Sequence, residues 1–595
     1  MARRRLAQAA QTLRLSRDAL ALGRQAAPHE AWLTIGLQAA SAGAIITQLL
    51  IIKLLASQIA APKPFSNLLT TFGAVIVLLL VTALANSAMV VQTELRPVLS
   101  LRISSYALER LLRTSSSVPL AQLETAEFQD RLARAQEGGE SRSIELSGAV
   151  QAIGSGLATS AGSVAAIFVL APVLGPVLLL GALPLWAATS ANVGLFRTFV
   201  TSFTADRRQR AYLMRVLTAK ESAHEIRAYD AGEMFLSRFI TVCGRLAQES
   251  RRLAQARVLR STVAAVISTC LTGLCLVIVI YMIHAHDMTG ATGVTVIAAI
   301  IFASRGVAGI ALGTSSLREC SVFLQDYYEL TAIKPPDLPA RRPADTASAK
   351  TGPSRFCIEA RELTFCYPTA SMPSLADVSI SLRQGEITAL IGRNGSGKSS
   401  LAKLLCGLYS PASGVLTWDG VPVDAATLHE RSTIVFQDFA RYMMTARENI
   451  AVGSSGDSDR IAAMLASGDL PPLSEVIDDL PAGLDTLLGA YFSGGVDISS
   501  GQWQRIAIAR SLLRGGQLIV LDEPGAFLDA VAERAVLTRA KQLARHSAVL
   551  LISQNLDNLD LVDKAYLMAD GKIIDSLTPH DLLRSQDLYS RLVGP

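Results

Sequence analysis

The chain has 595 residues, of which 50% are hydrophobic, and it carries a formal net charge of +5. A chain of this length exceeds a single domain, and its mean hydropathy of +0.35 excludes an ordinary soluble protein. It contains no basic run with interleaved aromatic residues, so we expect no nucleic-acid partner despite the positive charge. Nearly all long uncharged stretches lie before about Leu317, which predicts a membrane part followed by a soluble part.

Six stretches of the first part are long and apolar enough to cross a bilayer, for which a helix needs roughly 20 residues. Residues 32–52 and 64–93 contain no charged residue, and the uncharged run 146–196 is long enough for two helices with a hairpin between them. Two further apolar stretches cover residues 261–283 and about 288–317. We therefore expect six membrane-spanning helices.

The loops between these stretches differ in their content of lysine and arginine. Segments 94–145 and 197–260 are rich in arginine, whereas the other connections carry two lysines or none. Because basic residues are retained on the cytoplasmic side, we expect both termini and both long loops in the cytoplasm. The pattern of the two long loops predicts helices that continue beyond the membrane. A polar break in each, near Phe128 and Ile226, is either solvated helix surface or a docking segment.

The composition changes again after the last apolar stretch. Residues 334–355 are rich in proline, alanine, serine and threonine, which is typical of an interdomain linker. Short β-rich runs then alternate with helical segments and predict a largely parallel, covered sheet; the runs are residues 356–359, 386–391, 518–521 and 548–552. We expect an all-α transmembrane domain at residues 1–333, the linker, and an α/β P-loop ATPase domain at residues 356–595.

A glycine-rich run follows one of these predicted strands. The run Gly392-Arg-Asn-Gly-Ser-Gly-Lys398-Ser399 fits the phosphate-binding loop pattern and precedes a predicted helix. Its backbone N–H groups would converge on phosphate oxygens, with Lys398 on the β- and γ-phosphates and the Ser399 hydroxyl on Mg²⁺. The residues expected to bind nucleotide here are Gly392, Arg393, Asn394, Gly395, Ser396, Gly397, Lys398, Ser399 and Ser400. ATP and Mg²⁺ are the expected cofactors, and a glycine-rich turn without ligand is the alternative.

A second apolar strand, residues 518–521, ends in two acids, Asp522 and Glu523. Buried strands seldom end in this way without a cation. Asp522 would hold Mg²⁺ through water, and Glu523 would polarise the attacking water. A solvated strand end is the alternative, and it is weaker in a chain that also has a phosphate loop.

The run Ile498-Ser499-Ser500-Gly501-Gln502, followed by Trp503-Gln504-Arg505, resembles the signature sequence of the ATP-binding cassette (ABC) family. The similarity covers essentially the whole chain. Six spans and an ATPase in one chain resemble the exporter type of that family, in a multi-pass membrane protein of the bacterial cell membrane with a cytoplasmic ATPase domain. The run from Leu488 to Arg505 is similar to bacterial lantibiotic and natural-product exporters.

The resemblance implies roles for further residues. It assigns Tyr367 to adenine stacking, Gln437 to the γ-phosphate and Mg²⁺, and Asp529 to the loop that joins two sites. Gln554 stands at the switch position, so Glu523 and Gln554 are the expected catalytic pair. The nucleotide contacts would include the signature residues Ser499, Ser500, Gly501 and Gln502, and the Mg²⁺ ligands would be Ser399, Gln437 and Asp522. The segments around Phe128 and Ile226 would be coupling helices.

Two positions depart from the family pattern. Gln554 replaces the usual histidine; it can donate an amide hydrogen bond but brings no positive charge, which would slow hydrolysis. Ser500 replaces the first of two glycines, and its Cβ would restrict the approach of nucleotide held by a partner chain.

In the family, ATP lies between the phosphate loop of one chain and the signature of another, so the resemblance implies a dimer with a second half-transporter. Both a homodimer and a heterodimer remain open. The implied function is an ATP-hydrolysing exporter subunit, surrounded by membrane lipid, that moves a peptide, lipid or small natural product outward by alternating access. The alternative is an ATP-binding regulatory half of a heterodimer with weak hydrolysis of its own.

Overall fold

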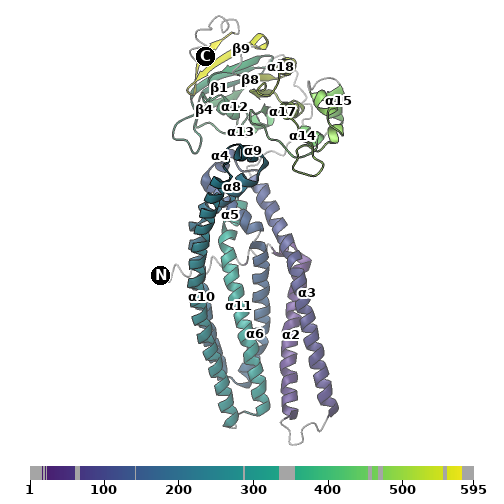
Figure 1. The fold of residues 1–595 in the computed structure, drawn as a ribbon, viewed down its shortest axis with the longest axis vertical. Coiled ribbons are helices and arrows are strands. Elements are labelled where there is room, and N and C mark those ends of the chain that lie inside the picture. The colour runs from purple at the N-terminus through teal and green to yellow at the C-terminus, as the bar shows by residue number, and fades with distance from the viewer. Residues whose placement is uncertain are drawn as a thin grey trace. The chain divides into compact units, whose positions relative to one another are not determined.

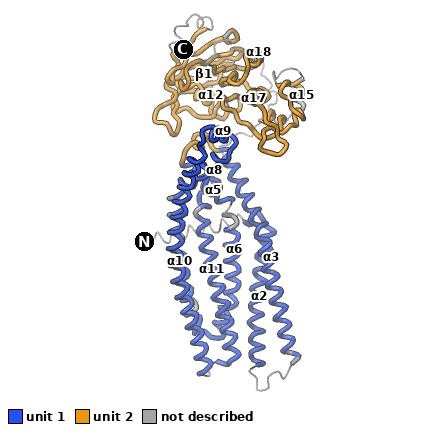
Figure 2. Tube along the Cα trace, in the orientation of Figure 1, with its two compact units in different colours: residues 1–117, 127–334 blue, residues 118–126, 335–595 orange. Residues whose placement is uncertain are grey.

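The computed structural model describes residues 23–59, 68–140, 142–285, 288–333, 356–452, 458–466, 473–553 and 559–578, together with Arg17 and Ala21. The chain forms two compact units (Figure 2). Unit 1 comprises Met1–Ser117 and Glu127–Lys334, and unit 2 comprises Val118–Ala126 and Pro335–Pro595. The expected linker, residues 334–355, lies outside the described residues, so its boundaries stay a prediction.

Unit 1 is helical (Figure 1). Its helices are α2 (Pro28–Ile59), α3 (Leu68–Ser115), α5 (Ala126–Glu140), α6 (Arg142–Leu170), α7 (Leu174–Ser202), α8 (Thr204–Thr218), α9 (Lys220–Ala228), α10 (Gly232–His284) and α11 (Gly290–Thr331). Six of them, α2, α3, α6, α7, α10 and α11, are long and apolar enough to cross a membrane, as the sequence predicted. The 53 residues of α10 make it roughly 80 Å long, far more than a bilayer core, so it extends into the arginine-rich region.

Helices α6 and α11 lie side by side and meet through glycines (Figure 1). A Cβ atom at Gly156 would lie 2.7 Å from the carbonyl oxygen of Gly306, and one at Gly313 would lie 2.7 Å from that of Ala149. The missing side chains let the two backbones approach closely, which is how helices without a hydrophobic driving force associate in lipid.

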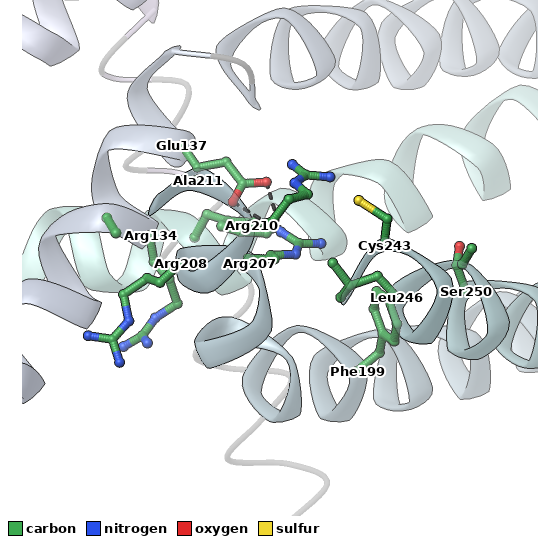
Figure 3. A pocket seen from close by; sticks show the side chains of 13 residues that line it. Arg134, Glu137, Phe199, Arg207, Arg208, Arg210, Ala211, Cys243, Leu246 and Ser250 are labelled. Carbon is green, nitrogen blue, oxygen red and sulfur yellow. Dashed lines mark hydrogen bonds and ion pairs between the residues drawn. The ribbon is translucent and has the colours of Figure 1, made fainter. Parts of the chain in front are cut away.

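Ion pairs join the helices where the chain becomes rich in arginine, and Figure 3 shows the one between Arg207 and Glu137. The pairs are Arg134–Asp326 at 2.6 Å, Arg207–Glu137 at 3.0 Å and Arg208–Asp130 at 2.8 Å. They connect α5 to α8 and α11 around a pocket of about 620 Å³ whose walls include Phe199 and Leu246. Most of the arginines of this pocket are therefore neutralised by acids of neighbouring helices.

Unit 2 contains two sheets. Their strands are β1 (Cys357–Phe365), β2 (Leu375–Arg383), β3 (Ile387–Ile391), β4 (Ser413–Trp418), β5 (Val421–Pro422), β6 (Ser432–Val435), β7 (Leu518–Asp522), β8 (Ala548–Ile552), β9 (Lys564–Ala569) and β10 (Lys572–Leu577). The larger sheet has the order β10-β9-β3-β8-β7-β6 and is parallel except for the β9–β10 pair. Every residue of β3, β7 and β8 is buried, which explains their continuous apolar sequences.

The smaller sheet has the order β2-β1-β4-β5 and is antiparallel. The β-rich run that starts at Phe356 was expected in the parallel sheet, and the structure places it here instead. Its alternating buried and exposed side chains suit a strand with one covered face, and a run of four residues was too short to reveal that alternation.

Helices surround the sheets of unit 2. They are α4 (Leu120–Leu123), α12 (Lys398–Leu405), α13 (Ala425–Arg431), α14 (Ala446–Ala451), α15 (Ser458–Ala466), α16 (Leu473–Asp478), α17 (Ser500–Arg514) and α18 (Ala530–Ala544), with 3₁₀ turns at Gly483–Asp485 and Leu559–Leu561. Although α4 precedes α5 in sequence, Leu120 and Ala121 pack on the apolar cluster of unit 2. The Tyr409 hydroxyl donates a hydrogen bond of 2.5 Å to the Glu124 carboxylate at the end of α4.

Candidate nucleotide-binding site

The order of the parallel strands brings the two predicted halves of the site to one edge of the larger sheet. Strand β8 lies between β3 and β7, with Leu390 and Asp522 both in register with Ile552. The phosphate loop leaves the carboxyl end of β3, and the acid pair stands at the carboxyl end of β7. Ligands of open parallel sheets bind beyond these carboxyl ends.

The conformation of the phosphate loop requires its glycines. Gly395 and Gly397 have φ angles of +81° and +105°, a left-handed region that favours glycine. Gly392 lies against the carbonyl oxygen of Met568 so closely that a Cβ atom would overlap it, and a Cβ at Gly397 would lie 2.7 Å from the Ser374 carbonyl oxygen. The loop then enters α12, which begins at Lys398.

Lys398 is folded back onto its own loop. Its ammonium group donates hydrogen bonds to the carbonyl oxygens of Gly392, at 2.7 Å, and Arg393, at 2.9 Å. Burial lowers the pKa of Lys398, while the charges of Glu523 and Asp522 act in the opposite direction. The nearby Ser396 hydroxyl is buried and has no hydrogen-bond partner within the described residues. A buried cation and an unpaired hydroxyl in a loop at a helix N-terminus fit a phosphate ligand.

The acid pair is held in two different environments. Asp522 is 4% exposed, and this burial raises the pKa of its carboxyl, opposed by the Ser399 hydroxyl and Lys398. Glu523 has φ +48°, uncommon for a residue with a side chain, and its carboxylate accepts a hydrogen bond of 2.5 Å from the Gln437 amide. The Asp522 carboxylate interacts with the Ser399 hydroxyl, and the Gln437 amide contacts the neighbouring Glu523. Carboxylate, hydroxyl and amide oxygens are ligands that suit Mg²⁺, so Asp522, Ser399 and Gln437 could hold that ion.

Tyr367 lies beside the helix that follows the phosphate loop. Its hydroxyl is 3.1 Å from the Ser400 hydroxyl, and the Lys403 ammonium lies 5.6 Å from its ring centre. Phe365 and Tyr409 support the ring edge-on, at centroid distances of 4.9 and 5.5 Å. The structure therefore places an aromatic side chain next to the loop, where adenine stacking was expected.

The signature residues form the start of α17. Ser499 caps this helix and is paired with Gln502 in a reciprocal capping box. The Ser500 hydroxyl accepts a hydrogen bond of 3.3 Å from Arg441, and a Cβ at Gly501 would lie 2.7 Å from the Phe527 carbonyl oxygen. Within the described part of the chain, no hydrogen bond or ion pair joins residues 499–502 to the phosphate loop. The expectation that the signature serves nucleotide held by a partner chain agrees with this and stays a prediction.

The remaining two predicted residues have different outcomes. Asp529 caps α18 by accepting a hydrogen bond of 2.8 Å from the Ala532 amide, and it lies 3.6 Å from Arg505. Gln554 lies outside the described residues, so its role as the switch stays a prediction.

Sequence reasoning gave no role to Gln504. This residue is 1% exposed; its amide nitrogen lies 3.4 Å from the Glu523 carbonyl oxygen, and its amide oxygen accepts a hydrogen bond of 3.0 Å from the Phe527 amide. It thereby joins the signature helix to the segment that follows the acid pair. The available signal was an uncharged polar residue among the buried apolar residues of α17.

A phosphate loop and an acid pair on a parallel sheet define a P-loop ATPase domain, here in one chain with six apolar helices. Residues 375–526 match the family model described as ABC transporter. This part of the chain is an ABC transporter ATPase domain, and the chain has the fold of an ABC exporter.

The chain is similar to several named transporters. It is 31% identical over 372 residues to the ATP-dependent lipid A-core flippase of Photobacterium profundum, which is 61% of either chain. It is 34% identical over 236 residues, 39% of either chain, to the nisin transport ATP-binding protein NisT of Lactococcus lactis subsp. lactis. The matches thus span about three fifths or less of these relatives' lengths. A bacterial Atm1-family ABC exporter with ATP bound shares the fold, with a TM-score of 0.77 and 20% identity over 95% of this chain and 97% of the other.

Proposed function

We propose that this chain is an ATP-hydrolysing subunit of a membrane exporter, which pairs with a second half-transporter and moves a peptide, lipid or small natural product out of the cytoplasm. The observation that carries the proposal is the convergence of Lys398, Asp522, Glu523 and Gln437 at one sheet edge. Six apolar helices in the same chain support transport across a membrane, and so do relatives named for a lipid A-core flippase and for nisin transport.

The chemistry of the site follows from its own residues. Lys398 would exchange its two carbonyl partners for phosphate oxygens, and the Ser396 hydroxyl would gain a first partner. Mg²⁺, when bound, would neutralise charge on the phosphates. Glu523 is positioned by Gln437 to accept the proton of an attacking water. Gln437 thus connects the base to the expected metal position, so ligand binding and base placement depend on one another.

A dimer is required for the site to be complete. The signature residues of this chain contact Arg441 and Phe527, and they would contribute to nucleotide bound by a partner chain. Closure of two such sites would then shift the membrane helices between two states, which is alternating access. The ATPase domain would lie in the cytoplasm because the arginine-rich loops do.

The proposal is tested by the ATPase activity of the full chain, purified and returned to lipid. Glu523→Gln should lower the Mg-ATPase rate by about 10²- to 10⁴-fold because it removes the general base. The same variant should still bind nucleotide, whereas Lys398→Ala should lose binding. Glu430→Gln, at an exposed acid of the same unit, is the matched control and should keep the wild-type rate. An unchanged rate in Glu523→Gln would contradict the assignment of the base.

A second candidate function rests on the two departures from the family pattern, Gln554 and Ser500. Under this second function the chain is the regulatory half of a heterodimer, and this half binds ATP but hydrolyses it weakly. It predicts that the chain alone binds Mg-ATP, hydrolyses it slowly, and gains activity when a different half-transporter is added. Full activity of the chain alone, lost in Glu523→Gln, would reject it.

A further inference from the structure

Unit 1 contains a cavity of about 490 Å³ between α2, α3, α6 and the residues that precede α2. Its volume is within the range of about 300–1,000 Å³ that is typical of sites for small ligands. The described lining combines apolar side chains with three glutamines and three arginines, and it contains no aspartate or glutamate. Its glutamines and arginines are Gln38, Gln92, Gln151, Arg17, Arg24 and Arg96, and Thr34 and Ser147 add two hydroxyl groups.

The three glutamines lie at a similar depth in the predicted spans. Gln38 is six residues inside the uncharged stretch that begins at Trp32, and Gln151 is five residues inside the one that begins at Leu146. Gln92 lies in the last turn of the uncharged stretch 64–93, one turn before Arg96. Each is thus within two helical turns, about 11 Å, of the charged end of its span. This depth is the boundary between lipid headgroups and acyl chains.

The polar groups of the cavity are satisfied by one another only in part, within the described residues. Gln92 is 7% exposed, and its amide oxygen accepts a hydrogen bond of 3.2 Å from Gln151. The Gln38 amide donates to the Gln151 carbonyl oxygen at 3.4 Å. Among the described residues, no hydrogen bond engages the amide nitrogen of Gln92, and neither a hydrogen bond nor an ion pair engages Arg96. Polar side chains inside a membrane span are costly and usually mark a binding site or a transport pathway.

Two glycines of α6 make room for these side chains. A Cβ atom at Gly148 would overlap the guanidinium of Arg96, and one at Gly154 would overlap the amide of Gln38. The Arg96 guanidinium and the Gln38 amide therefore both lie close to the backbone of α6. The pocket of Figure 3 is also rich in arginine, but it differs from this cavity because acids from α5 and α11 pair with three of its arginines.

We propose that this cavity binds an anionic membrane lipid through its phosphate group. The guanidinium of Arg96, supported by Arg24 and the Gln92 amide, would donate to the phosphate oxygens. The apolar lining, which includes Ile35, Leu99 and Val150, would contact the part of an acyl chain next to the headgroup. The arginine-rich ends of the helices mark the cytoplasmic leaflet, which is where anionic lipids attract basic side chains. Because a lipid is one of the cargo classes proposed above, this inference rests on the proposed export function and names one binding site and one chemical class for it.

The test measures lipid binding to the full chain in detergent without nucleotide. The probes are dioctanoyl phosphatidylglycerol, which is anionic, dioctanoyl phosphatidylcholine, which is zwitterionic, and inorganic phosphate. Native mass spectrometry should find phosphatidylglycerol bound about tenfold more tightly than phosphatidylcholine, and Arg96→Gln should remove most of that difference, as expected for a hydrogen-bonded charge. Gly148→Ala should reduce the difference less than Arg96→Gln does, because its Cβ moves the Arg96 guanidinium and leaves the charge in place.

Matched controls separate this site from general effects. Gly36→Ala changes a glycine of α2 with open space around it, and Arg113→Gln removes an exposed arginine of α3 that pairs with Glu109; both should bind phosphatidylglycerol as the wild type does. Equal binding of phosphatidylglycerol to wild type, Arg96→Gln and Gly148→Ala would overturn the proposal. Displacement of the lipid by millimolar inorganic phosphate would also overturn it, in favour of a soluble anion. Glu523→Gln should bind lipid normally, so this test and the ATPase test fail independently.

Discussion

Individual residues of the nucleotide site are held in states that cost stability. Asp522 is a nearly buried carboxylate, and burial raises its pKa. Lys398 is a nearly buried ammonium, and burial lowers its pKa. In each case the folded protein disfavours the charged form that nucleotide and Mg²⁺ require. The site is thus prepared for a ligand at the expense of the empty protein.

This cost predicts the effect of Asp522→Asn on stability. Because the folded pKa of Asp522 is raised, its contribution favours folding at low pH and is lost as the pH rises through that pKa. Near neutral pH, Asp522→Asn should therefore raise the apparent Tm of the nucleotide-free protein, and this gain should vanish toward pH 4. Differential scanning fluorimetry at both pH values measures it, with exposed Asp478→Asn as the control. A lower Tm of Asp522→Asn at pH 7 would contradict the argument.

Most of the site could be predicted residue by residue, because the phosphate loop and the acid pair are local patterns with a known mechanism. Ser500 was expected to restrict the approach of nucleotide held by a partner chain, and this stays a prediction. Within the chain, the close backbone contact of the signature lies at Gly501, beneath the Phe527 carbonyl oxygen. Gln504 received no role because its partners, Glu523 and Phe527, are distant in sequence. Contacts of this kind follow from tertiary packing and leave no periodic signal.

At the scale of elements, the close contact of α6 and α11 depends on residues without side chains. Gly306 lies against Ser160. A Cβ atom placed on Gly306 would lie 2.8 Å from the carbonyl oxygen of Gly156. The sequence predicted both helices from their apolar length. It did not predict this contact, because glycines in an apolar run do not reveal which helix they face.

Gly306→Val should separate α6 from α11. The added side chain meets backbone, which cannot move aside easily, so we expect a loss of about 1–3 kcal/mol, typical of overpacking. The measurement is the midpoint of thermal unfolding in detergent. Gly273→Val, on α10 with open space around it, is the matched control and should unfold near the wild-type temperature. Equal losses in the two variants would mean that valine harms these helices in general.

At the scale of the whole molecule, the separation of the signature from the phosphate loop predicts complementation between defective chains. Lys398→Ala disables one half of a site and Gly501→Asp the other half. A dimer of the two variants, co-expressed with different tags and purified through both, has one site with two intact halves. It should hydrolyse ATP at roughly half the wild-type rate if the sites act independently, while either variant alone should be inactive.

This recovery of activity requires that the chain forms a homodimer. ATPase assays of the pair purified through both tags measure the recovery. No recovery of activity in a pair that co-purifies in equal amounts would contradict sharing of sites between copies of this chain. Normal activity of Gly501→Asp alone would contradict the role of the signature.

Residues 118–126 belong to unit 2, so one piece of this unit is synthesised long before the rest. This short piece leaves the ribosome more than 200 residues before the sheets on which Leu120 packs and the tyrosine that bonds Glu124. At bacterial and eukaryotic synthesis rates of about 5–20 residues per second, it waits roughly 10–50 s for them. Throughout that interval the nascent chain carries this apolar turn uncovered between two helices of unit 1. A fragment that begins at residue 356 would lack Leu120 and Ala121, which pack on its apolar cluster.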